Sequence, residues 1–173
     1  CHWQERNAKC DRAGMEAYRA QEDYLMCGGV YFQHGDDVLR IFYPNPKAVL
    51  PILMTDGEVQ LIAWGRRQKQ TGNLPMTGWA RLDSIYAGRC DKYFPKPVKI
   101  PVLSFMEKDL EGMSHWYDLQ KGQFIQGLLA KDGNERRVYV VTIEPELEDA
   151  QIHSRWPRIV QKGERSRINQ FDM

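Results

Sequence analysis

The sequence lacks most of the short signatures that identify common classes of protein. It has no GxxxxGK[ST] phosphate-binding loop, no GxGxxG segment opening a helix, and no serine between the glycines of a nucleophile elbow. No apolar run approaches the roughly 18 residues that a bilayer crossing needs, and residues 1–25 lack the apolar stretch of a secretory signal. These absences argue against the standard hydrolases, kinases, dehydrogenases and membrane proteins. They predict a soluble, cytoplasmic protein.

Metal-ligating residues and net charge are also sparse. The four cysteines, Cys1, Cys10, Cys27 and Cys90, contain no CxxC pair, and only four histidines accompany them. Neither a zinc site nor a disulfide framework is visible, so we expect no metal and no other cofactor. Each cysteine, with one exception named below, is interpreted as a small buried side chain. The 24 Lys+Arg nearly balance the 23 Asp+Glu, so bulk charge selects no class of partner.

The residues that are present predict one mostly β domain with an appended arm. Residues 1–25 are polar and rich in helix formers, which predicts a weak helix or a mobile arm, and residues 26–173 form the domain. Beyond Val30, short runs of β-branched and aromatic residues predict strands. The predicted strands are 30–32, 40–43, 48–54, 59–64, 99–105, 115–119, 124–130 and 137–143.

Turn and helix signals complete the predicted organisation. Glycine-containing turns at Asp56-Gly57, Lys121-Gly122 and 132–134 predict three hairpins. Short helices are expected at 81–87 and 146–151. The polar stretch 66–78 is expected to be a long loop, and long loops are often functional. A local basic cluster, 155–167, is by itself typical of a solvated face.

Several dispersed segments follow one another in a characteristic order. They are Met26-Cys27-Gly28, Phe42–Pro46, Trp64-Gly65, Ala80-Arg81, Pro101–Phe105 with Glu107, Gly127-Leu128, Thr142–Glu144 and Ile152–Pro157. This order resembles the SOS-response-associated peptidase (SRAP) family, whose members typically carry Met-Cys-Gly-Arg, Asn-Ile-Ala-Pro, Trp-Gly, Asn-Ala-Arg, Val-Pro-Ala-Asp-Gly-Phe-Tyr-Glu and Ile-His-Asp-Arg-Met-Pro. The likeness spans Met26 to about Val160 and suggests a divergent, phage-type member.

The resemblance implies both a fold and an activity. The fold is a compact α+β domain, mostly β, with a barrel-like antiparallel sheet and a few short helices. The activity is covalent capture of abasic sites in single-stranded DNA through a thiazolidine crosslink, with associated autopeptidase activity. Strand scission by a lyase reaction is a further step open to such an enzyme. We expect a monomer that acts in DNA repair without a cofactor and without a membrane.

The resemblance also assigns the site residues. Cys27, Glu107 and His153 match the family's catalytic cysteine, glutamate and histidine. Arg81 and Arg155 match arginines on the DNA-phosphate side of the pocket, where forked hydrogen bonds hold phosphates. A third DNA-contacting candidate is Trp79, since an indole can stack on an exposed base. Trp64 and Trp156 are interpreted as packing residues.

The chemistry of these residue types suits the reaction. A ring-opened abasic sugar is an aldehyde, and a neutral α-amino group with a pKa near ~8 can attack it to give a Schiff base. The thiol of the same N-terminal cysteine then closes the ring. A carboxylate such as Glu107 can hold the ammonium and move its proton, and an imidazole such as His153 titrates in the range needed for exchange with a sugar hydroxyl.

Three features leave alternatives open. The family's arginine after Cys-Gly is Gly29 here, and the asparagine before Ala-Arg is Trp79. Because 26 residues precede Cys27, its backbone nitrogen is a free amine only if the chain starts at Met26 or cleaves itself before Cys27. Otherwise the activity has been lost. Cys1 is a minor candidate for the reactive N-terminal cysteine. The alternative function is an inactive module that binds single-stranded nucleic acid. A general thiol peptidase has less support, because no oxyanion-hole signature accompanies Cys27.

Overall fold

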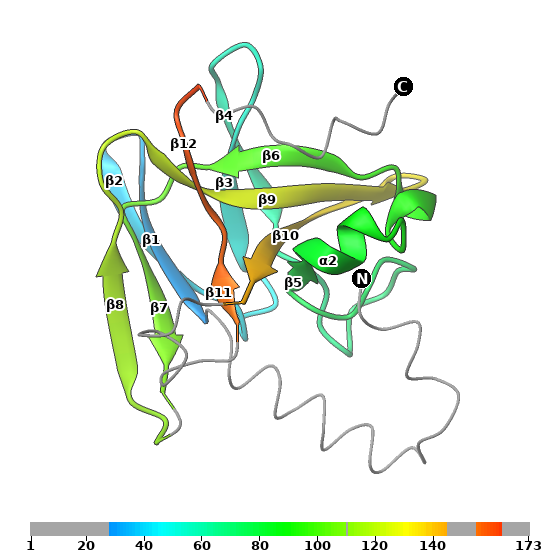
Figure 1. The fold of residues 1–173 in the computed structure, drawn as a ribbon, viewed down its shortest axis with the longest axis horizontal. Coiled ribbons are helices and arrows are strands. Elements are labelled where there is room, and N and C mark those ends of the chain that lie inside the picture. The colour runs from blue at the N-terminus through cyan, green and yellow to red at the C-terminus, as the bar shows by residue number, and fades with distance from the viewer. Residues whose placement is uncertain (1–27, 110, 145–154, 164–173) are drawn as a thin grey trace.

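The computed structural model describes residues 28–109, 111–144 and 155–163. Arm 1–25, the predicted helix 146–151, Cys27 and His153 lie outside the described residues. The elements, drawn in Figure 1, are β1 (Gly29–His34), β2 (Asp37–Phe42), β3 (Val49–Leu53), β4 (Val59–Ala63), β5 (Trp79–Arg81), α2 (Leu82–Tyr86), the 3-10 helix η2 (Asp91–Tyr93), β6 (Lys96–Ile100), β7 (Ser104–Lys108), β8 (Ser114–Asp118), β9 (Gln123–Asp132), β10 (Glu135–Ile143), β11 (Trp156–Pro157) and β12 (Ile159–Gln161).

The strands form two sheets. One sheet has four strands in the order β2-β1-β7-β8, all antiparallel. The other has eight strands, with β11-β10-β9-β6-β3-β4 as its path, β12 beside β9, and β5 beside β10. The β5–β10 pair is parallel, so this sheet is mixed. Within the described residues neither sheet closes on itself, which corrects the expectation of a barrel-like, wholly antiparallel sheet.

The domain has three layers, the two sheets and the helical segment, which are visible in Figure 1. Two apolar clusters fill the spaces between these layers. The larger cluster joins the sheets and includes Val30 and Phe105 from the first and Ile52, Ile100 and Val140 from the second. The smaller cluster lies on the other face of the larger sheet, under α2, and includes Ile85, Leu128 and Val141. Burying both faces of β9 and β10 explains why these strands read as nearly continuous apolar runs.

The predicted strands correspond closely to the structure, with one exception. The run 99–105 was expected to be a single strand, but it supplies the end of β6 and the start of β7. Pro101 lies between them and has no backbone N–H with which to continue a ladder. The chain crosses there from the larger sheet to the smaller one.

The turns gave a mixed outcome. Asp56-Gly57 and residues 132–134 do join hairpins, β3–β4 and β9–β10. Lys121-Gly122 does not, because β8 pairs with β7 while β9 pairs with strands of the other sheet. The carbonyl of Gly122 instead accepts a hydrogen bond from the backbone of Lys162, 2.7 Å away, at the end of β12.

Two further features bear on the expectations. Cys90 is 1% exposed and disulfide-bonded, so it is not the free buried thiol that was expected.

Among residues 28–109, 111–144 and 155–163, no helix has the length and apolar character needed to cross a bilayer.

Candidate functional site

Strand β7 carries the predicted catalytic glutamate. The Glu107 side chain is fully buried, at 0% exposure, and shares a face of β7 with Phe105, two residues earlier. That face is directed toward the cluster between the sheets, because Phe105 belongs to the cluster. A carboxylate at such a position is desolvated, a setting used to tune acid–base groups.

The chain next to Cys27 lies beside β7. The backbone N–H of Gly28 donates to the carbonyl of Met106 over 3.0 Å, and Gly29 pairs with Met106 in the β1–β7 ladder. Gly28 is the residue directly after Cys27, and Met106 is the residue directly before Glu107. The start of β1 is therefore fixed against the part of β7 that carries the glutamate.

The segment that follows His153 packs on the same strand. Trp156 of β11 contacts Phe105 of β7 edge-on, with ring centroids 5.2 Å apart. It also contacts Tyr117 of β8, with centroids 4.9 Å apart. Trp156 thus joins the two sheets, as its interpretation as a packing residue required, and it does so two positions along β7 from Glu107.

The two predicted DNA-binding arginines meet at Thr142 of β10. Arg81 pairs with Thr142 in the β5–β10 ladder. The Arg155 guanidinium, 8% exposed as a residue, donates from Nη2 to the Thr142 carbonyl over 2.7 Å and from Nε to its Oγ1 over 3.3 Å. Burial lowers the pKa of Arg155, and the like charge of Arg81 lowers it further.

Asp83 holds the more exposed of these arginines. Its carboxylate accepts hydrogen bonds from Nε and Nη2 of Arg81 over 3.1 and 2.7 Å. This contact, partly opposed by burial, lowers the pKa of Asp83 to about 2. The Arg81 side chain is 26% exposed. Arg81 therefore presents charge at the surface, while Arg155 is built into the sheet.

Trp79 lies in the hydrophobic core rather than at the surface. It is 4% exposed, and its ring packs against Tyr43 at 4.6 Å and Trp64 at 6.2 Å between centroids. In this position it offers no open face to a nucleobase, so the structure gives no support to a stacking role. Its sequence signal was indistinguishable from that of a core tryptophan, which is the commoner use of indole.

A histidine that the sequence reasoning did not single out lies opposite Glu107. His115 of β8 is the direct register partner of Glu107, and such pairs share a face with Cβ atoms about 4.5–5.5 Å apart. Its Nε2 lies 2.7 Å from Oδ2 of Asp109. Hydrogen bonds from His115 and from the backbone of Met113 lower the pKa of Asp109. The sequence feature that could have predicted this contact was the spacing of Asp109 and His115 on either side of the turn at Gly112.

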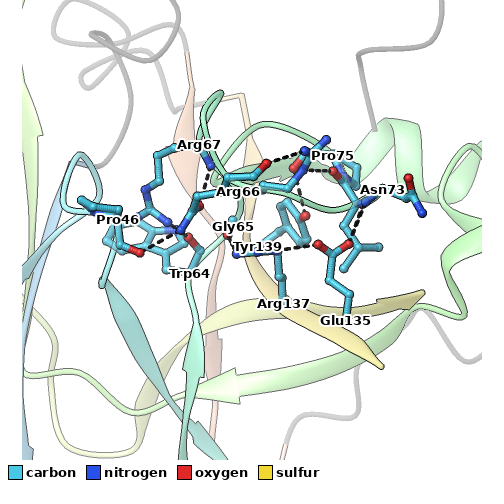
Figure 2. Close-up of polar contacts among 12 residues, drawn as sticks. Pro46, Trp64, Gly65, Arg66, Arg67, Asn73, Pro75, Glu135, Arg137 and Tyr139 are labelled. Atoms are coloured by element: carbon cyan, nitrogen blue, oxygen red, sulfur yellow. Dashed lines mark hydrogen bonds and ion pairs between the residues drawn. The ribbon is translucent and has the colours of Figure 1, made fainter. Parts of the chain in front are cut away.

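Loop 66–78 was expected to be functional because it is long and polar, and its arginines face inward. Arg66 donates to the carbonyls of Leu74 and Gln70, and Arg67 donates to those of Trp64 and Tyr43. The Arg67 guanidinium also lies 4.1 Å from the centroid of the Tyr43 ring. Figure 2 shows both arginines among the polar contacts that hold this loop.

Strand β10 holds the far side of this loop. Glu135 accepts hydrogen bonds from the backbone N–H groups of Asn73 and Leu74 over 3.1 and 2.8 Å, and Arg137 donates to Glu135 and to the carbonyl of Gly65 (Figure 2). Burial opposes ionisation of Glu135, but these donors outweigh it and lower its pKa.

Gly65 has φ +55°, and a Cβ there would lie 2.2 Å from the Thr77 carbonyl oxygen, which explains the glycine after Trp64.

The described residues provide no cluster of three or more His, Cys, Asp or Glu side chains that could hold a metal ion. Comparison with known proteins adds no assignment: no family model, no curated protein and no solved structure matches this chain. The arguments for function therefore come from the residues themselves.

Proposed function

We propose that this protein captures abasic sites in single-stranded DNA through an N-terminal Cys27, in the manner of the SRAP family that its motif order resembles. The observation that carries the proposal is the convergence on β7. Gly28, the residue after Cys27 in the sequence, is hydrogen-bonded to Met106, and Trp156, three residues after His153 in the sequence, packs on Phe105. Both contacts are made to the two residues of β7 directly before the buried Glu107, so segments from three distant parts of the chain come together on this strand.

The proposed reaction balances without a cofactor. The Cys27 amine attacks the aldehyde carbon of the ring-opened sugar and water leaves, giving a Schiff base. The Cys27 sulfur then adds to the same carbon, and its proton passes to the nitrogen, giving the thiazolidine. Glu107 accepts and returns the proton of the amine, and His153 exchanges a proton with the sugar hydroxyl. The net loss is one water molecule.

Arg81 supplies the phosphate contact in this proposal. It is the partly exposed member of the pair at Thr142, and an arginine binds phosphate by two parallel N–H donors. Arg155 is buried against Thr142 and is assigned to positioning the strand that leads into Trp156. Trp79 is assigned to the core.

A second candidate is an inactive module that binds single-stranded nucleic acid. Its support comes from the two positions that depart from the family pattern, Gly29 and Trp79, because both take part in packing. The ring of Phe42 lies over Gly29, with atoms 3.0 and 3.1 Å from the position of a Cβ, and Trp79 fills the core. Both positions serve packing, which a non-catalytic domain would allow.

The test uses protein that begins at Cys27 and a single-stranded oligonucleotide with one abasic site. We expect a denaturant-resistant adduct on a gel, none with Cys27→Ala, and formation about 10²–10⁴-fold slower with Glu107→Gln. Lys131→Gln, an exposed change on β9, is the matched control and should react normally. Circular dichroism checks that each variant is folded.

Two results would reject the catalytic proposal. Salt-sensitive binding with no adduct would favour the inactive module. An adduct that forms equally well with Cys27→Ala would assign the chemistry to another nucleophile.

A further inference from the structure

The four-stranded sheet β2-β1-β7-β8 packs on the larger sheet through one of its faces, and its other face points outward (Figure 1). Side chains alternate between the two faces of a strand, and Phe105 belongs to the cluster between the sheets. Its neighbour Met106 therefore belongs to the outward face. The register across the four strands places one outward row at Phe42, Gly29, Met106 and Trp116.

The two ends of this row carry exposed aromatic rings. Phe42 of β2 is 40% exposed and Trp116 of β8 is 38% exposed. Their ring centroids lie 6.2 Å apart in an edge-to-face arrangement, although two strands lie between β2 and β8. The side chains therefore extend toward each other over the middle of the sheet. Gly29 leaves room for this, because a Cβ there would lie 3.0 Å from the Phe42 ring.

An arginine completes this surface. Arg40, two residues before Phe42 on β2, is exposed and points to the same face. Its guanidinium carbon lies 5.4 Å from the centroid of the Trp116 ring and 5.6 Å from that of Tyr31 on β1. In the described part of the chain no carboxylate pairs with this guanidinium, which lies over the two rings. Tyr31, Arg40, Phe42 and Trp116 are called the outer platform below.

The outer platform combines exposed aromatic rings with a planar cation. Nucleobases stack on aromatic rings and on guanidinium planes, and the same cation attracts phosphate. Among the strand residues of this face, Arg40 and Lys108 are basic and only Asp118 is acidic. The surface therefore favours a flexible chain that carries both flat rings and negative charge.

We propose that the outer platform binds single-stranded DNA. A base would stack on the layer formed by Trp116, Phe42 and the Arg40 guanidinium, and its phosphate would be drawn to the same cation. Gly29 belongs to the row of Phe42 and Trp116 and is only two residues from Cys27 in the sequence, so nucleotides that flank an abasic site captured at Cys27 would lie near this surface. The inference rests on the proposed function for the nature of the ligand, and it adds a surface on the face of the sheet opposite Glu107.

The test measures binding separately from capture. The full chain is titrated into a labelled, unmodified oligothymidylate, which has no aldehyde, and fluorescence anisotropy is followed over a salt series. Trp116→Leu keeps an apolar side chain but removes the ring, so it should weaken binding about 5–20-fold, the effect of one stacked base. Trp116→Phe should retain most of the affinity. Phe94→Leu, the matched control, removes an exposed ring outside this sheet and should leave binding unchanged.

A strand made only of tetrahydrofuran abasic analogues separates stacking from charge, because it keeps the phosphates but has neither bases nor an aldehyde. It should bind more weakly than the oligothymidylate, and Trp116→Leu should not weaken it further. Arg40→Gln should weaken binding of both strands, by about 3–10-fold, and lower the slope of log K against log salt by about 0.7. Arg40→Lys should keep the salt slope and recover only part of the affinity, because an ammonium has no plane on which a base can stack.

Three outcomes would overturn the proposal. The first is an absence of saturable binding of the oligothymidylate by folded protein near physiological salt. The second is unaltered affinity in Trp116→Leu and Arg40→Gln, or an equal effect of Trp116→Leu on the baseless strand, because stacking would then play no part. The third is binding of a proline-rich peptide that is tighter than that of the strand and depends on Trp116, because the outer platform would then be a peptide site.

Failure of the capture reaction is distinguished from failure of this inference. Loss of the covalent adduct, with strand binding that still depends on Trp116, would reject the reaction at Cys27 and support the outer platform. A normal adduct in protein whose strand binding does not depend on Trp116 or Arg40 would do the reverse.

Discussion

The arginines of loop 66–78 and Arg81, which pairs with Thr142, are of the same residue type but are used differently. Arg66 and Arg67 of the loop donate to backbone carbonyls, as does Arg137 of the neighbouring strand β10. Arg81 is held by the side chain of Asp83, and its guanidinium remains partly exposed. The loop arginines fix a segment that has no regular structure, whereas Arg81 keeps a charge at the surface.

This difference shows why basic residues in a sequence do not by themselves locate a nucleic-acid site. The loop contains more arginine than β5 does, but its guanidinium groups replace the hydrogen bonds that a strand ladder would give. A buried carbonyl without a donor costs about 1–3 kcal/mol, so such arginines are a structural need. The comparison predicts that changes in the loop lower stability, and that changes at Arg81 and Asp83 alter DNA binding.

Arg67→Ala should have the largest effect, a loss of about 2–4 kcal/mol in the free energy of unfolding. The change removes donors to the Tyr43 and Trp64 carbonyls and the contact with the Tyr43 ring. Urea denaturation measures it, with the exposed Arg136→Ala as a control that should stay within about 0.5 kcal/mol. A change of similar size in both variants would show that the loop network is not special.

Glu135→Gln should cost about 1–2 kcal/mol at neutral pH, because the carboxylate holds two backbone N–H groups and Arg137. The pKa of Glu135 is lowered on folding, so its ionised form stabilises the native state above the unfolded pKa of ~4.3. That stability is lost as the pH falls through the folded pKa. The gap between wild type and variant should therefore shrink in acid, and a gap that is constant from pH 7 to pH 3 would contradict this.

Arg81→Gln should weaken binding of single-stranded DNA about 3–10-fold and lower the slope of log K against log salt by about 0.7, the effect of one phosphate contact. Fluorescence anisotropy over a salt series measures both. Stability should be nearly unchanged. An unaltered salt slope would remove Arg81 from the interface.

Asp83→Asn should have the smallest effect and the opposite sign. The change frees the Arg81 guanidinium from its carboxylate partner and removes one negative charge from the surface. Binding of single-stranded DNA should therefore tighten about twofold to threefold. The gain should vanish in the background of Arg81→Gln. If it persists there, the effect is one of general charge and not of Arg81.

The sequence predicted most of the strands because runs of β-branched and aromatic residues were separated by clear turn signals. It missed β5, whose pairing with β10 is non-local and covers only Trp79–Arg81. It also missed β11 and β12, which are too short to show a period. Among the site residues, motif order alone proposed Glu107, and the sequence did not show that it is fully buried or that His115 lies opposite.

The same limit applies to two of the expectations that the structure altered. A tryptophan in the core and one at a DNA surface have the same sequence signature, so Trp79 could not be placed before its neighbours were known. A meander of strands also does not reveal whether its sheet closes. The crossing at Pro101 between two open sheets depends on packing across the whole domain.

Intact mass spectrometry of the protein after incubation with an abasic oligonucleotide tests the central claim most directly. The account predicts one covalent species whose mass equals the chain from Cys27 onward plus the oligonucleotide minus one water molecule. A covalent species that retains residues before Cys27, or a complete absence of adduct with folded protein that begins at Cys27, would contradict it.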